Sequence, residues 1–588
     1  MHRIHRHLFI LLVVPFLLAA CARPTPETRV EVVKETVIVT RVVRETVEVT
    51  RRVDVTTTPL PAPSKVTLDL NFGADVTTLD PQTAEDPDSI DVIENLFVGL
   101  TRYNPETGRV EPALADSWDI SDDGLTWTFR LRDDVTWVRY NPVDDAVEQI
   151  RPVVAADFLN GLRRLCHPTN TSYYAGVVAP FIKGCQSLRD KAPAEFREED
   201  WDLLGVEAPE DNLLVIELEV PFSPFLSVLT MWPLRPIPQE VIDRFGERWI
   251  EPGVILTNGP FLLRQWVHGT RMTLERNPFW PADWPGNVEV VQIYFHDPVT
   301  AAAWWQEGRL DLLATDQVGT PDLVATPTAF FFAFAYDKEP FDNVGVRRAF
   351  SAALDREALV REALKGAGLP MRHLTPPGLF GAPPRDEVGV GFDPQLARKA
   401  LEEAGYPDCQ EFPQVTLAVL KDSPSWAAAV EFAIARWQEV LGCPADRFQV
   451  VSQDWDTLLT MVSPDAETEA RPHLWTYGWE ADYPDANNWL GDLLWCEVPV
   501  NQLKRPCEET DDLIVQARVE RDPDKRLELY RQIEEQFFGP EGEFPIIPLW
   551  VGVQPVARQS WLTYSPAVFG GERYDLYRLD WKAKLAGP

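Results

Sequence analysis

Short strand-like and helix-like patterns of hydrophobic residues follow one another along most of the chain. Four stretches have the apolar pattern of β-strands: residues 66–72, 123–137, 213–220 and 415–420. Three stretches repeat apolar residues at the spacing of a helix face: residues 344–365, 393–405 and 426–442. The second of these helices begins after Asp393, a residue type that caps helix N-termini, and ends at Gly405. Strands that alternate with helices predict an α/β fold.

The N-terminus has the form of an export signal. Arg3 and Arg6 precede an apolar run, Leu8 to Leu18, which is too short for the roughly 20 residues of a membrane-spanning helix. Small residues then lead directly into Cys21, and this arrangement resembles the lipobox of bacterial lipoproteins. The resemblance implies that residues 1–20 are a signal peptide and that a lipid is attached to the Cys21 sulfur. The alternative is an ordinary signal peptide followed by a chance cysteine.

Residues 21–63 differ from the rest of the chain and are expected to form a lipid-anchored stalk. KETVIVTRVV at Lys34 and RETVEVTRRV at Arg44 are near-repeats. Their valines and threonines favour an extended chain, but a heptad-like spacing of apolar residues leaves a coiled coil open as an alternative. A cluster of prolines ends the segment, and no further linker of this kind follows.

Composition and charge narrow the function classes. At 588 residues the chain is long enough for about two or three domains. Asp and Glu outnumber Lys and Arg by 91 to 55, and the resulting net charge of -36 disfavours nucleic acid and anionic lipid as partners. Such a surface suits cationic ligands, although solubility alone is the simpler explanation. The 21 tryptophans fit large cores and also a ligand cleft with flat aromatic walls.

Six cysteines remain besides Cys21, and an even number in an exported chain predicts disulfides. They form three couples along the sequence, and the simplest pairing joins the members of each couple: Cys166 with Cys185, Cys409 with Cys443, and Cys496 with Cys507. Metal binding is the alternative, but no CxxC motif occurs and the eight histidines are scattered. We therefore expect three disulfides, no metal site and no cofactor.

Six stretches of the chain, taken in order, carry a resemblance to one family. They are DVTTLDPQTAEDPDSIDVIENLFVGLTRYNPETGRVEPALADSWDISDDGLTWTFRLRDDVTW, FGERWIEPGVILTNGPFLLRQWVHGTRMTLERNPFW, EPFDNVGVRRAFSAALDRE, ARKALEEAGYP, VSQDWDTLL and GWEADYPDANNWL. Together they extend across nearly all of residues 66–560. The chain resembles the oligopeptide- and dipeptide-binding class, family 5, of the extracellular solute-binding proteins that serve ABC importers.

The resemblance implies a periplasmic-binding-protein-like α/β fold of two hinged lobes around a cleft, with an added third subdomain. Lobe I is expected to be discontinuous and to comprise residues 64–97, 223–327 and 550–588. Residues 98–222 are expected to form the added subdomain, and residues 328–549 lobe II. A ligand in the cleft closes the lobes, and the importer distinguishes the closed state from the open one.

The stretch TYGWEADYPDANNWL carries the main candidate site. In peptide-binding relatives the aspartate at the position of Asp482 receives the ligand's α-amino group, and the resemblance implies the same role here. A carboxylate suits this task because an ammonium offers three donors and forms short charge-assisted bonds with it. The alternative is that Asp482 caps a turn, because this segment is rich in turn-forming residues. Trp479 and Trp455 lie where the family places pocket indoles, with core packing as the alternative.

Four further residues are candidates from the same resemblance. Glu85 matches a segment that in relatives lies beside the bound peptide as an added strand, where main-chain pairing gives affinity independent of side chains. Tyr173 or Tyr174 is expected to close the cleft from the added subdomain. Trp550 lies near the last crossing between the lobes, where relatives carry aromatic residues.

The chain departs from the family pattern in three places. Some peptide-binding relatives carry an arginine six residues before the key aspartate, where it can meet the ligand's carboxylate, and this chain has Thr476 there. Pro87 lies in the segment expected to pair with the ligand and lacks a backbone N–H. Residues 137–158 replace a short turn of the family. These departures keep oligosaccharides, opines and metal chelates, which other members bind, as alternative ligands.

The resemblance predicts a binding protein and not an enzyme. It implies a lipid-anchored receptor on the outer face of the cytoplasmic membrane that captures peptides, or a similar small solute, for an ABC permease. Contact with the membrane is expected only through the lipid. A hydrolase is one alternative, but no GxSxG or HExxH motif and no nucleophile–histidine set stands out. A surface sensor or adhesion module is the other.

Overall fold

The computed structural model describes residues 65–498 and 502–587. The expected signal peptide, Cys21 and the stalk lie outside the described residues. Within the described part, no helix is both long enough and apolar enough to cross a membrane.

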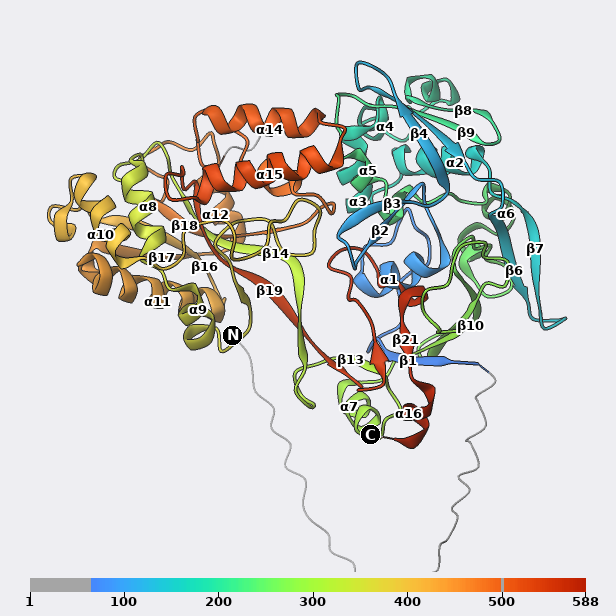
Figure 1. Ribbon diagram of the computed structural model, residues 1–588. Coiled ribbons are helices and arrows are strands. Elements are labelled where there is room, and N and C mark those ends of the chain that lie inside the picture. Colours follow the sequence, from blue (N-terminus) through green and yellow to red (C-terminus); the bar gives the residue numbers. More distant parts are fainter. Residues whose placement is uncertain (1–64, 499–501, 588) are drawn as a thin grey trace, which may run out of the picture. The chain divides into compact units, whose positions relative to one another are not determined.

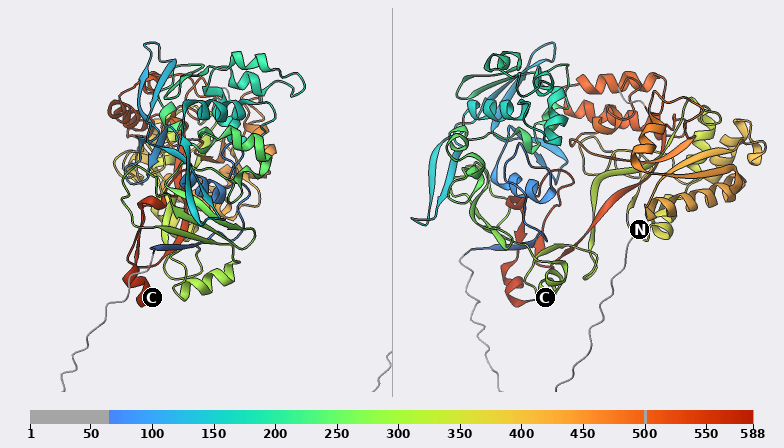
Figure 2. Two further views of the ribbon diagram at one scale, coloured as in Figure 1. Left: turned by 90° about the vertical axis from the view of Figure 1, so that its right-hand side faces the viewer. Right: turned by 180° about the vertical axis from the view of Figure 1, so that it is seen from behind.

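One large mixed sheet of 11 strands organises the described chain (Figure 1). Its strands, in spatial order, are β10 (Phe261–Val267), β11 (Arg271–Arg276), β12 (Val290–Tyr294), β1 (Thr67–Asn71), β13 (Leu312–Ala314), β19 (Ile546–Arg558), β14 (Asp322–Phe334), β18 (Leu474–Glu480), β16 (Val415–Leu420) and β17 (Phe448–Gln453), with β15 (Leu369–Pro370) beside β19. The two longest strands, β14 and β19, have 13 residues each and pair antiparallel. They can be followed from behind in Figure 2. Their pairing shifts register between Ala325 and Ala329, so the ladder is interrupted within the centre of the sheet.

The described chain also forms four smaller sheets. They are β2 (Thr101–Asn104) with β3 (Arg109–Pro112), the four-stranded β4 (Ala115–Ile120), β5 (Thr126–Leu131), β9 (Leu213–Glu217) and β8 (Val206–Glu210), the hairpin β6 (Thr136–Asn141) with β7 (Ala146–Pro152), and β20 (Leu562–Thr563) with β21 (Arg578–Leu579). The strands predicted at 66–72, 213–220 and 415–420 are therefore confirmed as β1, β9 and β16. The stretch 123–137 forms two strands in different sheets, because β5 pairs with β4 and β9 whereas β6 turns into its own hairpin with β7.

The helices are mostly short, and several begin at a residue whose side chain caps the N-terminus. They are α1 (Pro87–Leu96), α2 (Ala155–Cys166), α3 (Tyr173–Val178), α4 (Cys185–Arg189), α5 (Phe225–Val228), α6 (Gln239–Phe245), α7 (Pro298–Gln306), α8 (Val344–Ala352), α9 (Arg356–Ala358), α10 (Pro394–Glu403), α11 (Pro424–Leu441), α12 (Trp455–Val462), α13 (Asn487–Leu490), α14 (Glu509–Val519), α15 (Pro523–Phe538) and α16 (Trp581–Ala586). The predicted helices at 393–405 and 426–442 are confirmed as α10 and α11. Asp393 caps α10 as expected, since its carboxylate accepts from the backbone N–H groups of Gln395 and Leu396.

The single helix predicted over 344–365 is wrong. The chain breaks it after α8, and Asp355 caps the new helix α9 by accepting from the backbone N–H of Ala358. The buried Arg356 donates to the carbonyl oxygens of Ser351, Leu354 and Pro548, which places a cation where a continuous helix would show an apolar face. The helical period alone does not reveal such a cap.

The hydrophobic core divides along the two long strands. One cluster of buried side chains draws on residues 68–293 and 561–579. Two further clusters are formed by side chains from residues 329–551. This stretch begins in β14 and ends in β19. Tyr483 is the one buried member of the first cluster from this middle stretch among the described residues.

The three disulfides join the predicted partners, and their pairing is confirmed. Cys166 bonds Cys185, Cys409 bonds Cys443, and Cys496 bonds Cys507. Each bond closes a loop within one sequence neighbourhood, with separations of 19, 34 and 11 residues.

Candidate ligand site

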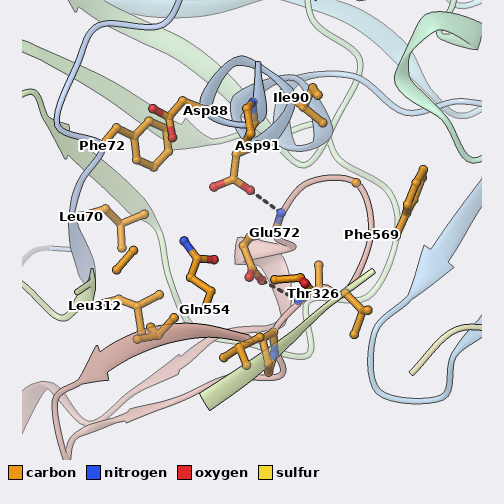
Figure 3. A pocket seen from close by; sticks show the side chains of 18 of the residues that line it. Leu70, Phe72, Asp88, Ile90, Asp91, Leu312, Thr326, Gln554, Phe569 and Glu572 are labelled. Atoms are coloured by element: carbon orange, nitrogen blue, oxygen red, sulfur yellow. Dashed lines mark hydrogen bonds between the residues drawn. The ribbon is translucent and has the colours of Figure 1, made fainter. Parts of the chain in front are cut away.

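A cavity of about 560 Å³ lies beside the paired strands β14 and β19 (Figure 3). Segments far apart in sequence form its wall: the loop after β1, the start of α1, the ends of β14 and β18, and residues 564–574. Of the residues predicted from the sequence, Glu85 and Tyr174 line it directly. The end of β18 contributes Glu480 and Ala481, the two residues that precede Asp482.

The segment around Glu85 is a helix start. Asp86 caps α1 by accepting from the backbone N–H of Ser89, and Pro87 is the first helical residue. The missing N–H of Pro87 therefore breaks no helical hydrogen bond, because the first turn of a helix has no acceptor for it. Helix α1 directs Asp88 and Asp91 to the cavity wall.

The structure brings Glu85, Tyr173 and Asp482 together. The Tyr173 backbone N–H donates to Glu85 Oε1 over 2.7 Å, and the Tyr173 hydroxyl donates to Asp482 Oδ1 over 3.2 Å. The ring of Tyr174 lies edge-on to that of Tyr173, with centroids 5.2 Å apart. Either tyrosine was expected here from the sequence, and both lie at this site.

Asn488, on the short helix α13, positions two of the predicted residues. Its Oδ1 accepts from the Trp479 indole N–H and from the Asp482 backbone N–H, both over 3.0 Å. Its amide nitrogen donates to Asp482 Oδ2 over 3.3 Å. The Asp482 carboxylate accepts only from this amide and the Tyr173 hydroxyl among the described residues. Asp482 caps no backbone turn there, whereas Asp485 does, by accepting from the backbone N–H of Asn487.

Burial and neighbouring charges set the electrostatics of this end of the site. Burial raises the pKa of Asp482, and the bonds from Asn488 and Tyr173 partly offset this effect. Burial and the nearby Asp482 carboxylate raise the pKa of Glu480. Burial, together with the Asp482 carboxylate, raises the pKa of Tyr173 to about 12. A positive charge placed here would stabilise both ionised carboxylates.

Trp455 and Trp550 lie elsewhere. Trp455 opens α12, is 44% exposed, and stacks on Tyr477 with ring centroids 5.6 Å apart. Trp550 is 4% exposed and stacks on Phe330 within the core cluster of the middle stretch. Neither belongs to the described wall of the cavity, and for Trp550 the structure shows the packing role.

Thr476 is a structural residue. It is 1% exposed, and its hydroxyl accepts from the backbone N–H of Leu420 over 3.1 Å. The Thr476 side chain is therefore buried against strand β16 and does not belong to the described wall of the cavity.

Several wall residues were missed from the sequence: Asp88, Asp91, Trp232, Phe569 and Glu572. Only the spatial return of residues 564–574 to α1 brings them together, and short-range patterns carry no signal for that contact.

A model of the bacterial extracellular solute-binding proteins, family 5 Middle, matches residues 109–497, about two thirds of the chain. The chain belongs to this family. The predicted resemblance is thus confirmed.

Curated relatives of this family 5 chain match over most of its length. The probable deoxycholate-binding periplasmic protein YgiS of Escherichia coli is 29% identical, with 84% of this chain and 89% of that protein covered. The periplasmic oligopeptide-binding protein OppA of the same organism is 27% identical, with 85% and 89% covered. The oligopeptide-binding protein OppA of Bacillus subtilis is 26% identical, with 83% and 87% covered.

A solved structure shows the same fold. The unliganded open form of MppA, a periplasmic murein tripeptide-binding protein, has a TM-score of 0.73 and 23% sequence identity, with 88% of this chain and 96% of that chain covered. The family 5 chain has the two-lobed α/β fold of the periplasmic binding proteins. Its family consists of solute-binding proteins, not enzymes.

Proposed function

We propose that this protein is the substrate-binding component of an ABC importer and captures peptides in the cavity beside β14 and β19. The observation that carries the proposal is the Asp482 carboxylate, which is partly buried and held by two neutral donors, Tyr173 and Asn488. A carboxylate in this setting has a raised pKa and gains from an ammonium that brings charge and further donors. Relatives named as oligopeptide-binding proteins, which match most of this chain, support the choice of peptide.

The remaining parts of the proposal follow the chain's organisation. Lobe I comprises residues 64–97, 223–327 and 550–588, the added subdomain residues 98–222, and lobe II residues 328–549. The division of the core at β14 and β19 supports the boundary between lobe I and lobe II. Closure of the lobes around a ligand presents the permease with a distinct state.

Cys21 is proposed to carry a lipid that tethers the protein to the outer face of the membrane. Residues 22–63 then act as a stalk between the lipid and the folded part. The lipobox-like run before Cys21 supports this arrangement.

A second candidate ligand class comes from the relative YgiS, named as a probable deoxycholate-binding protein. Deoxycholate carries a carboxylate. The described cavity wall contains no lysine or arginine to pair with it, and deoxycholate has no ammonium to offer Asp482, which favours peptide over a bile acid.

The test is calorimetric titration of the purified protein with ligands identified by native mass spectrometry. Asp482→Ala should retain the fold and weaken binding of an amine-bearing peptide by about tenfold or more, as expected for loss of a charge-assisted bond. Asp512→Asn, which removes one exposed negative charge on α14, is the matched control and should bind like the wild type. Equal affinity of the Asp482→Ala variant and the wild type would remove the ammonium role, and release of a sugar or chelate from the protein would overturn the peptide assignment.

A further inference from the structure

The cavity wall is strongly one-sided in charge. Five carboxylates line it: Glu85, Asp88, Asp91, Glu480 and Glu572. No lysine or arginine is among the described residues of the wall. Net charge on the whole surface does not explain this, because the chain contains 55 lysines and arginines and pairs many of them with acids elsewhere.

Two of the carboxylates form a linked pair at one side of the cavity (Figure 3). Asp91 accepts from the Glu572 backbone N–H and, over 2.8 Å, from the Tyr574 hydroxyl. Glu572 Oε2 accepts from the Ala567 N–H over 3.1 Å and from the Tyr577 hydroxyl over 2.7 Å. Glu572 Oε1 accepts from no donor of the described residues. All donors to this pair are neutral, so no protein cation offsets its charge.

Asp88 adds a third carboxylate to the same side of the cavity (Figure 3). It lies in the first turn of α1 and accepts no hydrogen bond from the described residues. Burial, followed by the charges of Asp91 and Asp86, raises its pKa to about 7. Burial likewise raises the pKa of Asp91 to about 6 and, with Asp91 as a second cause, that of Glu572 to about 8. Burial and the neighbouring acids thus disfavour the ionised forms of these three carboxyl groups.

Aromatic rings complete the wall. The rings of Tyr174 and Trp232 meet edge-on with centroids 4.4 Å apart. The ring centroids of Phe569 and Trp232 are 6.3 Å apart. Aromatic faces attract cations through their quadrupole, and they also pack the methylene groups of a long side chain. The carboxylates can therefore pair with the charged end of a lysine or arginine side chain, and the aromatic rings can pack against its methylene groups.

We infer that the ligand carries a second positive charge: a lysine or arginine side chain that enters this cavity and pairs with Asp88, Asp91 and Glu572. The inference rests on the proposed function and names its substrate class as basic peptides. The amino end of the peptide lies at Asp482. Its free carboxylate lies outside the cavity, because the described wall has no lysine or arginine to receive it.

The test compares two sets of short peptides by calorimetry, one with lysine and one with norleucine at the same position, which removes the charge but keeps the chain. Wild type should bind a lysine peptide about tenfold or more tightly than its norleucine match, as for one charge-assisted contact. Asp88→Asn and Glu572→Gln should lower this ratio several-fold. Asp512→Asn should leave the ratio unchanged, because residue 512 lies outside the cavity wall. Thermal unfolding of each variant checks its fold, and Asp88→Asn keeps the test valid if Glu572→Gln destabilises the protein.

The outcomes separate the two proposals. Binding of both peptide sets with equal affinity would overturn the second charge and leave peptide capture standing. A lysine preference that persists undiminished in both cavity variants would also overturn the assignment to this cavity. Failure of the wild type to bind any peptide of either set would overturn the proposed function and the inference together.

Discussion

Two aspartates three positions apart in TYGWEADYPDANNWL have different surroundings. Asp482 is near the cavity, and its carboxylate accepts hydrogen bonds from two neutral groups, the Tyr173 hydroxyl and the Asn488 amide. Asp485 is fully buried and accepts from the Tyr530 hydroxyl over 2.6 Å, from Arg526 over 3.2 Å and from the Ser227 hydroxyl over 3.1 Å. One residue therefore has the surroundings of a binding group, and the other joins three separate segments of the fold.

Replacement of Asp485 should destabilise the protein without acting on the ligand directly. Asp485→Ala leaves the buried Arg526 unpaired, and removal of one partner from a buried pair costs about 3–5 kcal/mol. The free energy of unfolding, measured by urea denaturation, should fall by an amount in this range. Asp482→Ala is the matched comparison and should change it little. Equal stability of the Asp485→Ala variant and the wild type would contradict the structural role.

Some residues of the candidate site could be predicted from the sequence, and others could not. Asp482, Trp479 and Glu85 were found because they lie in stretches that resemble a family. Asp91 and Glu572 were missed because 481 residues separate them. Their contact depends on the course of the whole chain, and neither residue stands out among 91 acids.

Helices and strands could be predicted from the sequence where the conformation of a segment depends mainly on its own residues. Strand β16 and helices α10 and α11 match their predicted stretches because caps, period and boundaries agree locally. The single helix predicted over 344–365 is wrong because Asp355 caps a new helix start locally, and because the buried Arg356 makes a long-range hydrogen bond to the Pro548 carbonyl oxygen. The insertion at 137–158 was recognised, but its form was not predicted. It becomes the hairpin β6–β7 followed by the start of α2, and Arg151 at its end pairs with Asp157 and Glu240.

The Cys409–Cys443 disulfide fastens the end of α11 to the segment after α10 and is expected to contribute substantially to stability. Both cysteines are buried, and the bond closes the longest of the three loops, 34 residues apart in sequence. In the chain-entropy model, its loss costs about 3–4 kcal/mol. The double variant Cys409→Ala/Cys443→Ala should therefore unfold at a lower guanidinium concentration than the wild type.

The Cys496–Cys507 bond provides the matched control for this measurement. Its separation of 11 residues predicts a smaller loss in the same model, about 3 kcal/mol. An unchanged midpoint for the Cys409→Ala/Cys443→Ala variant would show that the closed loop does not constrain the unfolded chain.

For the whole molecule, the raised pKa values in the cavity link stability to pH. Glu572, with a pKa of about 8, and Asp88, at about 7, keep protons in the folded state that the unfolded chain releases at lower pH. The folded state then binds more protons than the unfolded one, so the free energy of unfolding falls as pH rises. Burial lowers the pKa of His473 from 6.5 to about 4, so below pH 6.5 the unfolded chain binds the additional proton at this residue. His473 therefore makes the free energy of unfolding rise with pH, but mainly below pH 6.5.

We therefore expect the melting temperature of the ligand-free protein to fall between pH 6.5 and pH 8. Differential scanning calorimetry across this window measures the change. Glu572→Gln should flatten the dependence, because the amide does not titrate, while Asp512→Asn should preserve it. A melting temperature that rises over the same window in the wild type would contradict the raised pKa values.

The passage of the chain through β14 and β19 has a consequence for how such proteins diversify. Residues 329–551 build two core clusters of their own, and their ends are neighbours, since Ala329 pairs with Val551. A unit whose ends meet can be exchanged between homologous genes without long joining segments. Such recombination would carry Trp479, Asp482 and Asn488 with it and leave Asp88, Asp91 and Glu572 behind. The two halves of the proposed ligand site can thus be inherited separately.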